Sequence, residues 1–187
     1  PGVMANADHI HPPVPGFEDV PMTTPHRYDC FRYGSYGKNL RGWVNDFLSE
    51  HPDYKVVPLT PCNMVLAQLM INDWYVSRRM TDPEGDYLLE SLAMAKAFRH
   101  YEELDMEGLV LLDGDDVLAV TMGSRMSGDV FDIHFEKARE DVDGAYPAIN
   151  QAFAQYLREQ YPSLCYLDRE EDMGIEGLRK AKLSYNP

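Results

Sequence analysis

The most restrictive feature of the sequence is a run of three strand-like segments separated by two tight turns. Residues 108–112 and 117–126 are largely apolar and flank Asp113-Gly114, and an Asp-Gly pair between apolar segments is a strong hairpin signal. Ser127-Gly128-Asp129 then leads into a third segment, residues 130–136. Consecutive strands joined by turns this short pair as antiparallel neighbours, so the sequence predicts a β-meander.

The segments before and after this meander have helical periodicity. We expect helices over about 36–50, 60–79 and 87–103 before it and over 145–160 after it, followed by a buried strand at 164–167 and a short terminal helix. This order, β-β-β-α-β-α preceded by helices, predicts an α+β fold. In the second and third helices, the side chains expected to face the core are Val65, Leu66, Leu69, Met70, Trp74, Tyr75, Leu88, Leu89, Leu92, Met94, Ala95 and Phe98.

Composition limits the organisation and the partners. Residues 1–30 are rich in proline and predict an extension or linker, whereas residues 31–187 have the length of one domain. The 31 acidic against 17 basic residues give a net charge of −14, which disfavours general binding to nucleic acid. Three widely spaced cysteines and the lack of a transmembrane segment or signal peptide favour a cytoplasmic protein with reduced thiols.

The third strand carries the most informative polar pattern. Strict alternation would place Phe131, Ile133 and Phe135 on one face and the ionisable Asp132, His134 and Glu136 on the other. Proton transfer or substrate hydrogen bonding by these three groups is the first interpretation. A solvated sheet surface is the second and a divalent metal site is a distant third, so no metal is expected.

The end of the chain combines an acidic run, Asp168–Asp172, with a basic terminal helix. Gly174 between them can supply a turn with positive φ. Glu176 in the first turn of the helix and Arg179 and Lys180 in later turns are favourable for helix electrostatics alone. Helix electrostatics does not explain the acidic run, which can either bind an amine or hold the basic residues in place.

Several of these segments together resemble a known family. The motifs are Phe135-Glu-Lys-Ala138, Gly144-Ala-Tyr146, Ile149-Asn-Gln-Ala-Phe153 and the whole terminal stretch from Asp168 to Pro187, with its Gly-Leu-Arg-Lys-x-Lys pattern. They resemble the DUF2156 family, which is related to the C-terminal domain of phosphatidylglycerol lysyltransferases. The resemblance is strongest over about 107–187, looser over 36–54 and absent from residues 1–30.

The resemblance implies a GNAT-like acyltransferase fold with a mixed, mainly antiparallel sheet flanked by helices. Family members often carry two such domains in tandem, so residues 31–187 would be the C-terminal one, with an N-terminal companion domain absent from this chain. The residues that it implies for the walls of the site are Glu136, Lys137, Gly144, Tyr146, Asn150, Asp168, Arg169, Glu170, Glu171, Asp172, Glu176, Arg179 and Lys180.

The expected function is acyl or aminoacyl transfer to an amine or hydroxyl acceptor, with a small charged substrate. His134 or Glu136 would orient or deprotonate the nucleophile, and Arg179 or Lys180 would bind an anionic group. A coenzyme A thioester or an aminoacyl-tRNA is the possible donor, although the loop from Arg139 to Ala145 keeps one glycine and adds acids where coenzyme A loops are glycine-rich. The alternative is a non-catalytic module that binds a charged metabolite or peptide.

Overall fold

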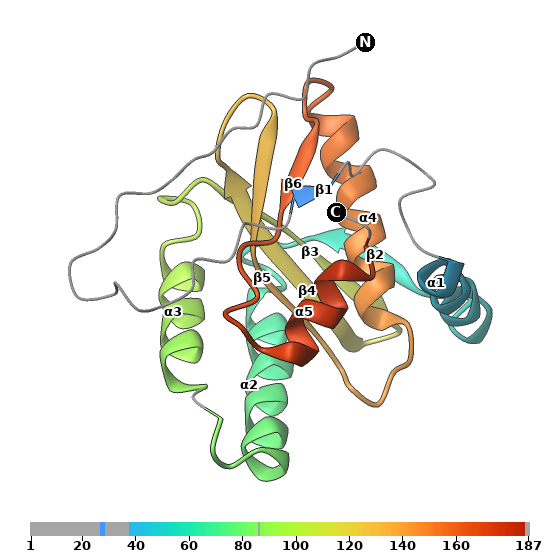
Figure 1. The fold of residues 1–187 in the computed structure, drawn as a ribbon, viewed down its shortest axis with the longest axis vertical. Helices are drawn as coiled ribbons and strands as arrows, with labels where there is room; N and C mark the ends of the chain where they lie inside the picture. Colours follow the sequence, from blue (N-terminus) through green and yellow to red (C-terminus); the bar gives the residue numbers. More distant parts are fainter. Residues whose placement is uncertain (1–26, 29–37, 86, 186–187) are drawn as a thin grey trace.

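The computed structural model describes residues 27–28, 38–85 and 87–185 and folds them around one sheet (Figure 1). The strands of this described part are β1 (Arg27–Tyr28), β2 (Lys55–Pro58), β3 (Met106–Asp113), β4 (Asp116–Arg125), β5 (Val130–Ala138) and β6 (Tyr166–Asp168). Its helices are α1 (Lys38–Glu50), α2 (Met64–Thr81), α3 (Leu88–Arg99), α4 (Ala145–Gln160) and α5 (Glu176–Leu183). The extension or linker predicted over residues 1–30 lies outside the described residues, apart from Arg27 and Tyr28.

The sheet has the spatial order β1-β6-β5-β4-β3-β2. The predicted meander is confirmed, because β3, β4 and β5 pair as antiparallel neighbours. Helix α4 then crosses over so that β6 pairs with β5 in parallel, over the short register from Val130↔Tyr166 to Asp132↔Asp168. Pro58 lies in β2 at one edge of the sheet, where a residue without an N–H group is tolerated.

Helices cover both faces of the sheet (Figure 1). On one face, α4 and α1 enclose a core that contains Phe47, Phe131, Ile149, Phe153 and Leu157, all fully buried. On the other face, α2 and α3 pack their buried side chains against a second cluster from β3 and β4. The chain therefore forms an α+β sandwich of three layers, as the element order predicted.

The predicted inner faces of α2 and α3 were partly wrong. Met70, Tyr75, Met94 and Phe98 are buried as expected, and Trp74 is partly buried. Both helices are apolar around much of their circumference, so periodicity could not select the inner face. The buried face of α2 includes Ala67, and that of α3 includes Ala97. The side chains that were expected inside and are exposed are Val65, Leu66, Leu69, Leu88, Leu89, Leu92 and Ala95.

Strand β5 carries a bulge. Met122 pairs with Phe135 and Ser124 pairs with Asp132, so Ile133 and His134 together stand opposite the single residue Gly123. A β-carbon on Gly123 would lie 1.9 Å from the Asp132 carbonyl oxygen, so the close approach of the two strands requires glycine here.

The bulge overturns the strict alternation predicted for this strand. Phe131 and Ile133 pack in the cluster beneath α4, but Phe135 packs against the cluster beneath α2 and α3. Glu136, in turn, contacts Asn150 of α4. The extra residue therefore switches the faces of the strand, and Glu136 is separated from Asp132 and His134 rather than aligned with them.

Candidate functional site

Polar side chains from distant parts of the sequence meet where β5 and β6 part. The two strands pair only as far as Asp132 and Asp168, and the chain beyond β6 turns through the acidic run into α5. Two charged clusters lie here, one on each side of the bulge. We call them the acceptor triangle (Asp132, His134 and Glu170) and the Glu136 cluster (Glu136, Thr121, Asn150 and Arg169).

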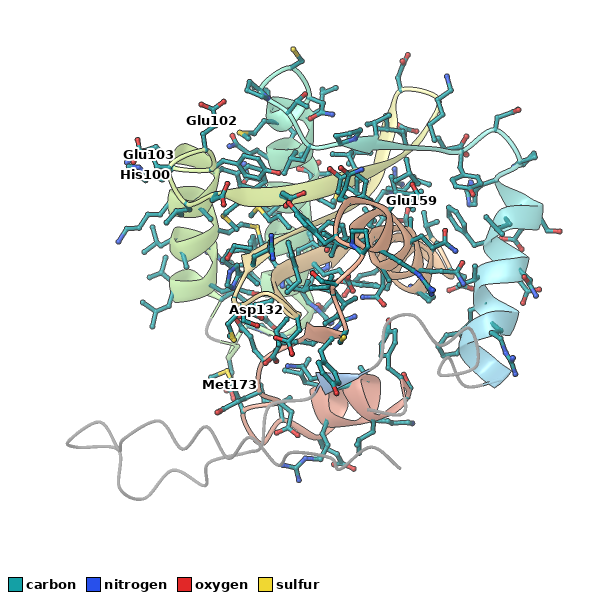
Figure 2. All side chains as sticks on the ribbon, turned by 90° about the horizontal axis from the view of Figure 1, so that it is seen from above. His100, Glu102, Glu103, Asp132, Glu159 and Met173 are labelled. Carbon is teal, nitrogen blue, oxygen red and sulfur yellow. The ribbon has the colours of Figure 1, made fainter. Side chains whose placement is uncertain are left out.

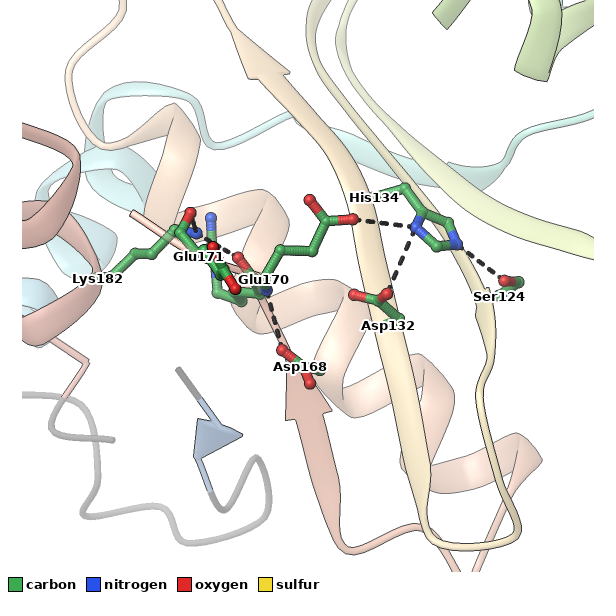
Figure 3. Close-up of polar contacts among 8 residues, drawn as sticks. Ser124, Asp132, His134, Asp168, Glu170, Glu171 and Lys182 are labelled. Carbon is green, nitrogen blue, oxygen red and sulfur yellow. Dashed lines mark hydrogen bonds and ion pairs between the residues drawn. The ribbon is translucent and has the colours of Figure 1, made fainter. Parts of the chain in front are cut away.

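The acceptor triangle brings together two predicted residues of β5 and one of the terminal motif (Figure 3). His134 Nδ1 lies 3.5 Å from Asp132 Oδ2 and 3.3 Å from Glu170 Oε1. The other ring nitrogen, Nε2, lies 2.9 Å from Ser124 Oγ. Asp132 is 7% exposed, and within the described residues its Oδ1 atom has no hydrogen-bond partner.

The surroundings perturb both titrating groups on β5. Burial is the largest influence on Asp132 and raises its pKa to about 6, and the carboxylates of Glu170 and Asp168 act in the same direction. The hydrogen bond with Glu170 is the largest influence on His134 and raises its pKa, against the lowering effect of burial. The triangle is thus a partly buried concentration of negative charge around one imidazole.

The backbone after β6 is arranged to present Glu170. The Asp168 side chain accepts a hydrogen bond of 2.9 Å from the Glu170 N–H group, and Glu170 has a left-handed φ of 56°. Lys182 of α5 donates to the carbonyl oxygens of Arg169 and Glu171, and burial lowers the pKa of this lysine. A left-handed non-glycine residue held from both sides indicates a fixed turn.

The Glu136 cluster is largely buried, and both carboxylate oxygens of Glu136 accept hydrogen bonds. Arg169 Nη2 donates to Glu136 Oε1 at 2.8 Å, and Asn150 Nδ2 donates to Glu136 Oε2 at 3.1 Å. Thr121 adds a longer contact of 3.4 Å. The Arg169 guanidinium also lies 4.9 Å from the ring centroid of Tyr185. Glu136 therefore anchors a buried cation in addition to any role toward a substrate.

Among the remaining residues of the acidic run and α5, two form an ion pair and the others are exposed to solvent. Asp172 is almost fully buried and accepts hydrogen bonds from Arg179 Nε at 2.6 Å and Nη2 at 3.1 Å. This hydrogen bonding with Asp172 raises the pKa of Arg179. Glu171, Glu176 and Lys180 are exposed. Of the two roles left open for the acids, Asp172 holds a basic residue and Glu170 faces the histidine.

The other predicted wall residues lie away from the triangle. Lys137 points to the α2–α3 side of the sheet, where it pairs with Glu90 at 2.7 Å and lies over the Trp74 ring. Gly144 begins α4 with φ 79°, and a β-carbon there would lie 2.5 Å from a backbone oxygen of α1. Gly144 therefore allows the start of α4 to approach α1 closely. Burial raises the pKa of Tyr146 to about 12.

The loop between β5 and α4 borders an acidic cavity. Arg139, Glu140 and Asp141 line it together with Trp74 and further acidic side chains, Asp73, Asp115 and Asp116. Arg139 is held by Asp141 through two hydrogen bonds, of 3.0 and 2.7 Å. The lining is therefore unfavourable for a pyrophosphate, as the acids of this loop indicated.

Sequence reasoning missed three residues of this region. Ser124 contacts the histidine, Thr121 contacts Glu136 and Lys182 fixes the turn after β6. The spacing along β4 could have suggested Ser124 and Thr121 only with knowledge of the bulge. Lys182 was passed over as one more surface cation, although it is 8% exposed, whereas Leu183 beside it is 51% exposed.

The fold is of the GNAT-like class. A tandem GNAT protein from the clavulanic acid biosynthesis pathway is similar with a TM-score of 0.53 at 11% identity, over 90% of this chain and 50% of that chain. A second structure, described as the C-terminal domain (DUF2156) of a lysylphosphatidylglycerol synthetase from Agrobacterium fabrum, has a TM-score of 0.50 at 14% identity, over 87% of this chain and 56% of that chain.

Within this class, the chain belongs to the family of the phosphatidylglycerol lysyltransferase C-terminal domain, whose model matches residues 33–187. A conserved protein of unknown function from Bacteroides thetaiotaomicron VPI-5482 is 34% identical with a TM-score of 0.79, over 87% of this chain and 55% of that chain. The chain thus spans about half the length of these structures. No curated protein matches it significantly. Among the described residues, no helix could cross a membrane.

Proposed function

We propose that the chain is an acyl- or aminoacyltransferase that works where β5 and β6 part, with an amine or hydroxyl as the acceptor. The observation that carries the proposal is the acceptor triangle. One side-chain atom from each of its three residues lies within 4.8 Å of the other two, and Ser124 Oγ lies 2.9 Å from the far nitrogen of the imidazole ring. The family and the fold support transfer chemistry but leave the donor and the acceptor undefined.

The triangle suits the recognition of a nucleophile that carries hydrogens. A neutral amine placed before it can donate one hydrogen to His134 Nδ1 and the other to Asp132 or Glu170, which leaves its lone pair directed at an activated carboxyl group; a hydroxyl can donate its single hydrogen to His134 Nδ1. Glu136 serves this arrangement indirectly, because it fixes Arg169 and with it the start of the turn that presents Glu170. We therefore assign nucleophile contact to His134 and positioning to Glu136.

Under this proposal, residues of α5 contact an anionic group of the donor. Lys180 is exposed, and Arg179 retains half of its side-chain surface while bound to Asp172. The acid-lined cavity beside Arg139 makes that loop a poor holder of coenzyme A, which favours an aminoacyl donor over a coenzyme A thioester. The companion domain implied by family resemblance would complete the donor site.

The test is transfer from acetyl-coenzyme A and from aminoacyl-tRNA to small amine and hydroxyl acceptors, with the purified chain alone and together with the N-terminal half of a tandem relative. His134→Gln should lower turnover about 100-fold, within the range for loss of a positioned polar catalytic group. His100→Gln is the matched control, because His100 makes a comparable pair with Glu103 away from this region. Equal turnover in the wild type and His134→Gln would contradict the assignment.

A further inference from the structure

We propose that the acceptor triangle, when no acceptor molecule occupies it, binds a divalent first-row transition-metal ion of the Zn²⁺ type, with Asp132, His134 and Glu170 as its ligands. The inference goes beyond the proposed function and does not depend on it, because it concerns the affinity of the chain for an ion and not the transfer of a group. One imidazole nitrogen and two carboxylate oxygens form a donor set that suits such ions.

The separations in the triangle fit a shared ion better than direct hydrogen bonds. Charged hydrogen bonds between nitrogen and oxygen are typically about 2.7–2.9 Å long. Elsewhere in the described chain, His51 Nδ1 lies 2.7 Å from Asp113 and His100 Nδ1 lies 2.8 Å from Glu103. In the triangle, the corresponding distances are 3.3 and 3.5 Å. Two ligands of a tetrahedral ion with bonds of about 2.0–2.2 Å lie roughly 3.3–3.6 Å apart.

The three candidate ligand atoms also lie together. One atom from each of Asp132, His134 and Glu170 falls within 4.8 Å of the other two. Figure 3 shows that Asp132 and His134 project from neighbouring positions on β5, while Glu170 reaches them from the turn after β6. Three such atoms can bind one ion after side-chain rotation, with the fourth tetrahedral position open to water or another ligand.

The histidine is oriented as a ligand. A metal-binding histidine commonly donates its second N–H group to a neighbouring acceptor, which fixes the tautomer and directs the lone pair at the ion. Nε2 of His134 lies 2.9 Å from Ser124 Oγ, a hydroxyl that can accept its N–H group, and the tautomer that makes this donation leaves the lone pair on Nδ1. Without a proton or a cation in front of Nδ1, that lone pair would face two carboxylates.

A second, independent observation points to a missing positive group. Asp132 is 7% exposed, and its Oδ1 atom has no hydrogen-bond partner in the described part of the chain. Buried carboxylates are normally paired with a cation or bound to a metal, because an unpaired buried charge is costly. A divalent cation would satisfy this site.

The experiment is calorimetric titration of the purified full chain with Zn²⁺, together with absorption spectra on addition of Co²⁺ in the same buffer. We expect one ion per chain. Asp132→Asn, His134→Gln and Glu170→Gln should each weaken the affinity at least about tenfold, and Ser124→Ala should weaken it about tenfold through the orientation of the ring. Glu170→Gln is the safest variant for folding, because the Glu170 side chain is 54% exposed.

His100→Gln is the matched control and should leave the affinity unchanged, since His100 and Glu103 lie at the end of α3, apart from Asp132 (Figure 2). Histidines outside the described residues, His9, His11 and His26, are all retained in His134→Gln. Unchanged Zn²⁺ affinity in His134→Gln would overturn the proposal, as would equal affinity for Mg²⁺, which prefers oxygen ligands. Zn²⁺ binding with no transfer activity would support the metal site and reject the proposed function alone.

Discussion

Glu136 and His134 are two residues apart on β5, yet the clusters around them differ in almost every physical respect. The Glu136 side chain is buried and accepts hydrogen bonds from Arg169 at 2.8 Å and from Asn150 at 3.1 Å. His134 lies 3.3 and 3.5 Å from two carboxylates, and the Oδ1 atom of Asp132 beside it has no hydrogen-bond partner among the described residues. The first cluster joins β5, α4 and the chain after β6, and both carboxylate oxygens of Glu136 are engaged in it. The second retains unused acceptor atoms, which is the property that a binding or catalytic group needs.

The largest effect should come from breaking the Glu136 cluster. Glu136→Ala leaves Arg169 in a largely buried position without its carboxylate partner, and removal of one member of a buried ion pair costs about 3–5 kcal/mol. The free energy of unfolding in urea should therefore fall by about 3 kcal/mol or more. A loss below about 1 kcal/mol would show that this cluster is not structural and would remove the contrast with the triangle.

The next effect should come from the bulge that separates the two clusters. Gly123→Ala places a methyl group against the Asp132 carbonyl oxygen, so β4 or β5 must move. We expect a loss of about 1–3 kcal/mol in unfolding free energy, typical of overpacking, and a marked loss of Zn²⁺ affinity. Gly128→Ala is the control, because a β-carbon at Gly128 meets no atom within 4 Å. Wild-type Zn²⁺ affinity in Gly123→Ala would mean that the bulge does not determine the geometry of the acceptor triangle.

The triangle itself should respond in the opposite direction from the Glu136 cluster. Asp132→Asn removes a buried charge that lacks a full set of partners, so the metal-free protein should become more stable by about 1 kcal/mol. Urea unfolding in the presence of a chelator measures this change. A loss of stability similar to that of Glu136→Ala would show that Asp132 is a structural group, and the comparison between the clusters would fail.

The smallest effect should come from an exposed ion pair on the loop before α4. Arg139 and Asp141 are bound at 2.7 Å, but their side chains are 39% and 67% exposed. Asp141→Asn should change the unfolding free energy by less than about 0.5 kcal/mol, because water and salt screen such pairs. A change above about 1 kcal/mol would indicate that the acid-lined cavity beside this loop contributes to the fold.

Local rules in the sequence predicted most of the architecture. The Asp113-Gly114 turn and the alternation of apolar residues gave the meander, and the apolar spacing of Ile149, Phe153 and Leu157 gave the inner face of α4. The inner faces of α2 and α3 were harder, because Leu69 and Leu89 are as apolar as the residues that are buried. When both faces of a helix are apolar, hydrophobicity does not determine which face is buried. The shape of the sheet against which the helix packs determines it.

The sequence predicted residues of the candidate site, but it did not predict how these residues divide into two clusters. Asp132, His134 and Glu136 were found from their spacing, and Glu170 was found from the terminal motif. Their division into two clusters depends on one inserted residue opposite Gly123, and a bulge in an antiparallel pair is a property of two strands together. The contact of Ser124 with His134 has the same origin, so neither could be inferred from one strand alone.

The parallel pairing of β6 has a consequence for how the chain folds. The meander can form from residues that are near neighbours in sequence, whereas β6 reaches β5 only after α4 has crossed the sheet, and β1 then pairs with β6 from the far end of the described chain. Contacts between distant residues form slowly because a long loop must first be closed. The acceptor triangle and the turn that holds Glu170 should thus be among the last parts to order on refolding, and the first to open in native-state hydrogen exchange.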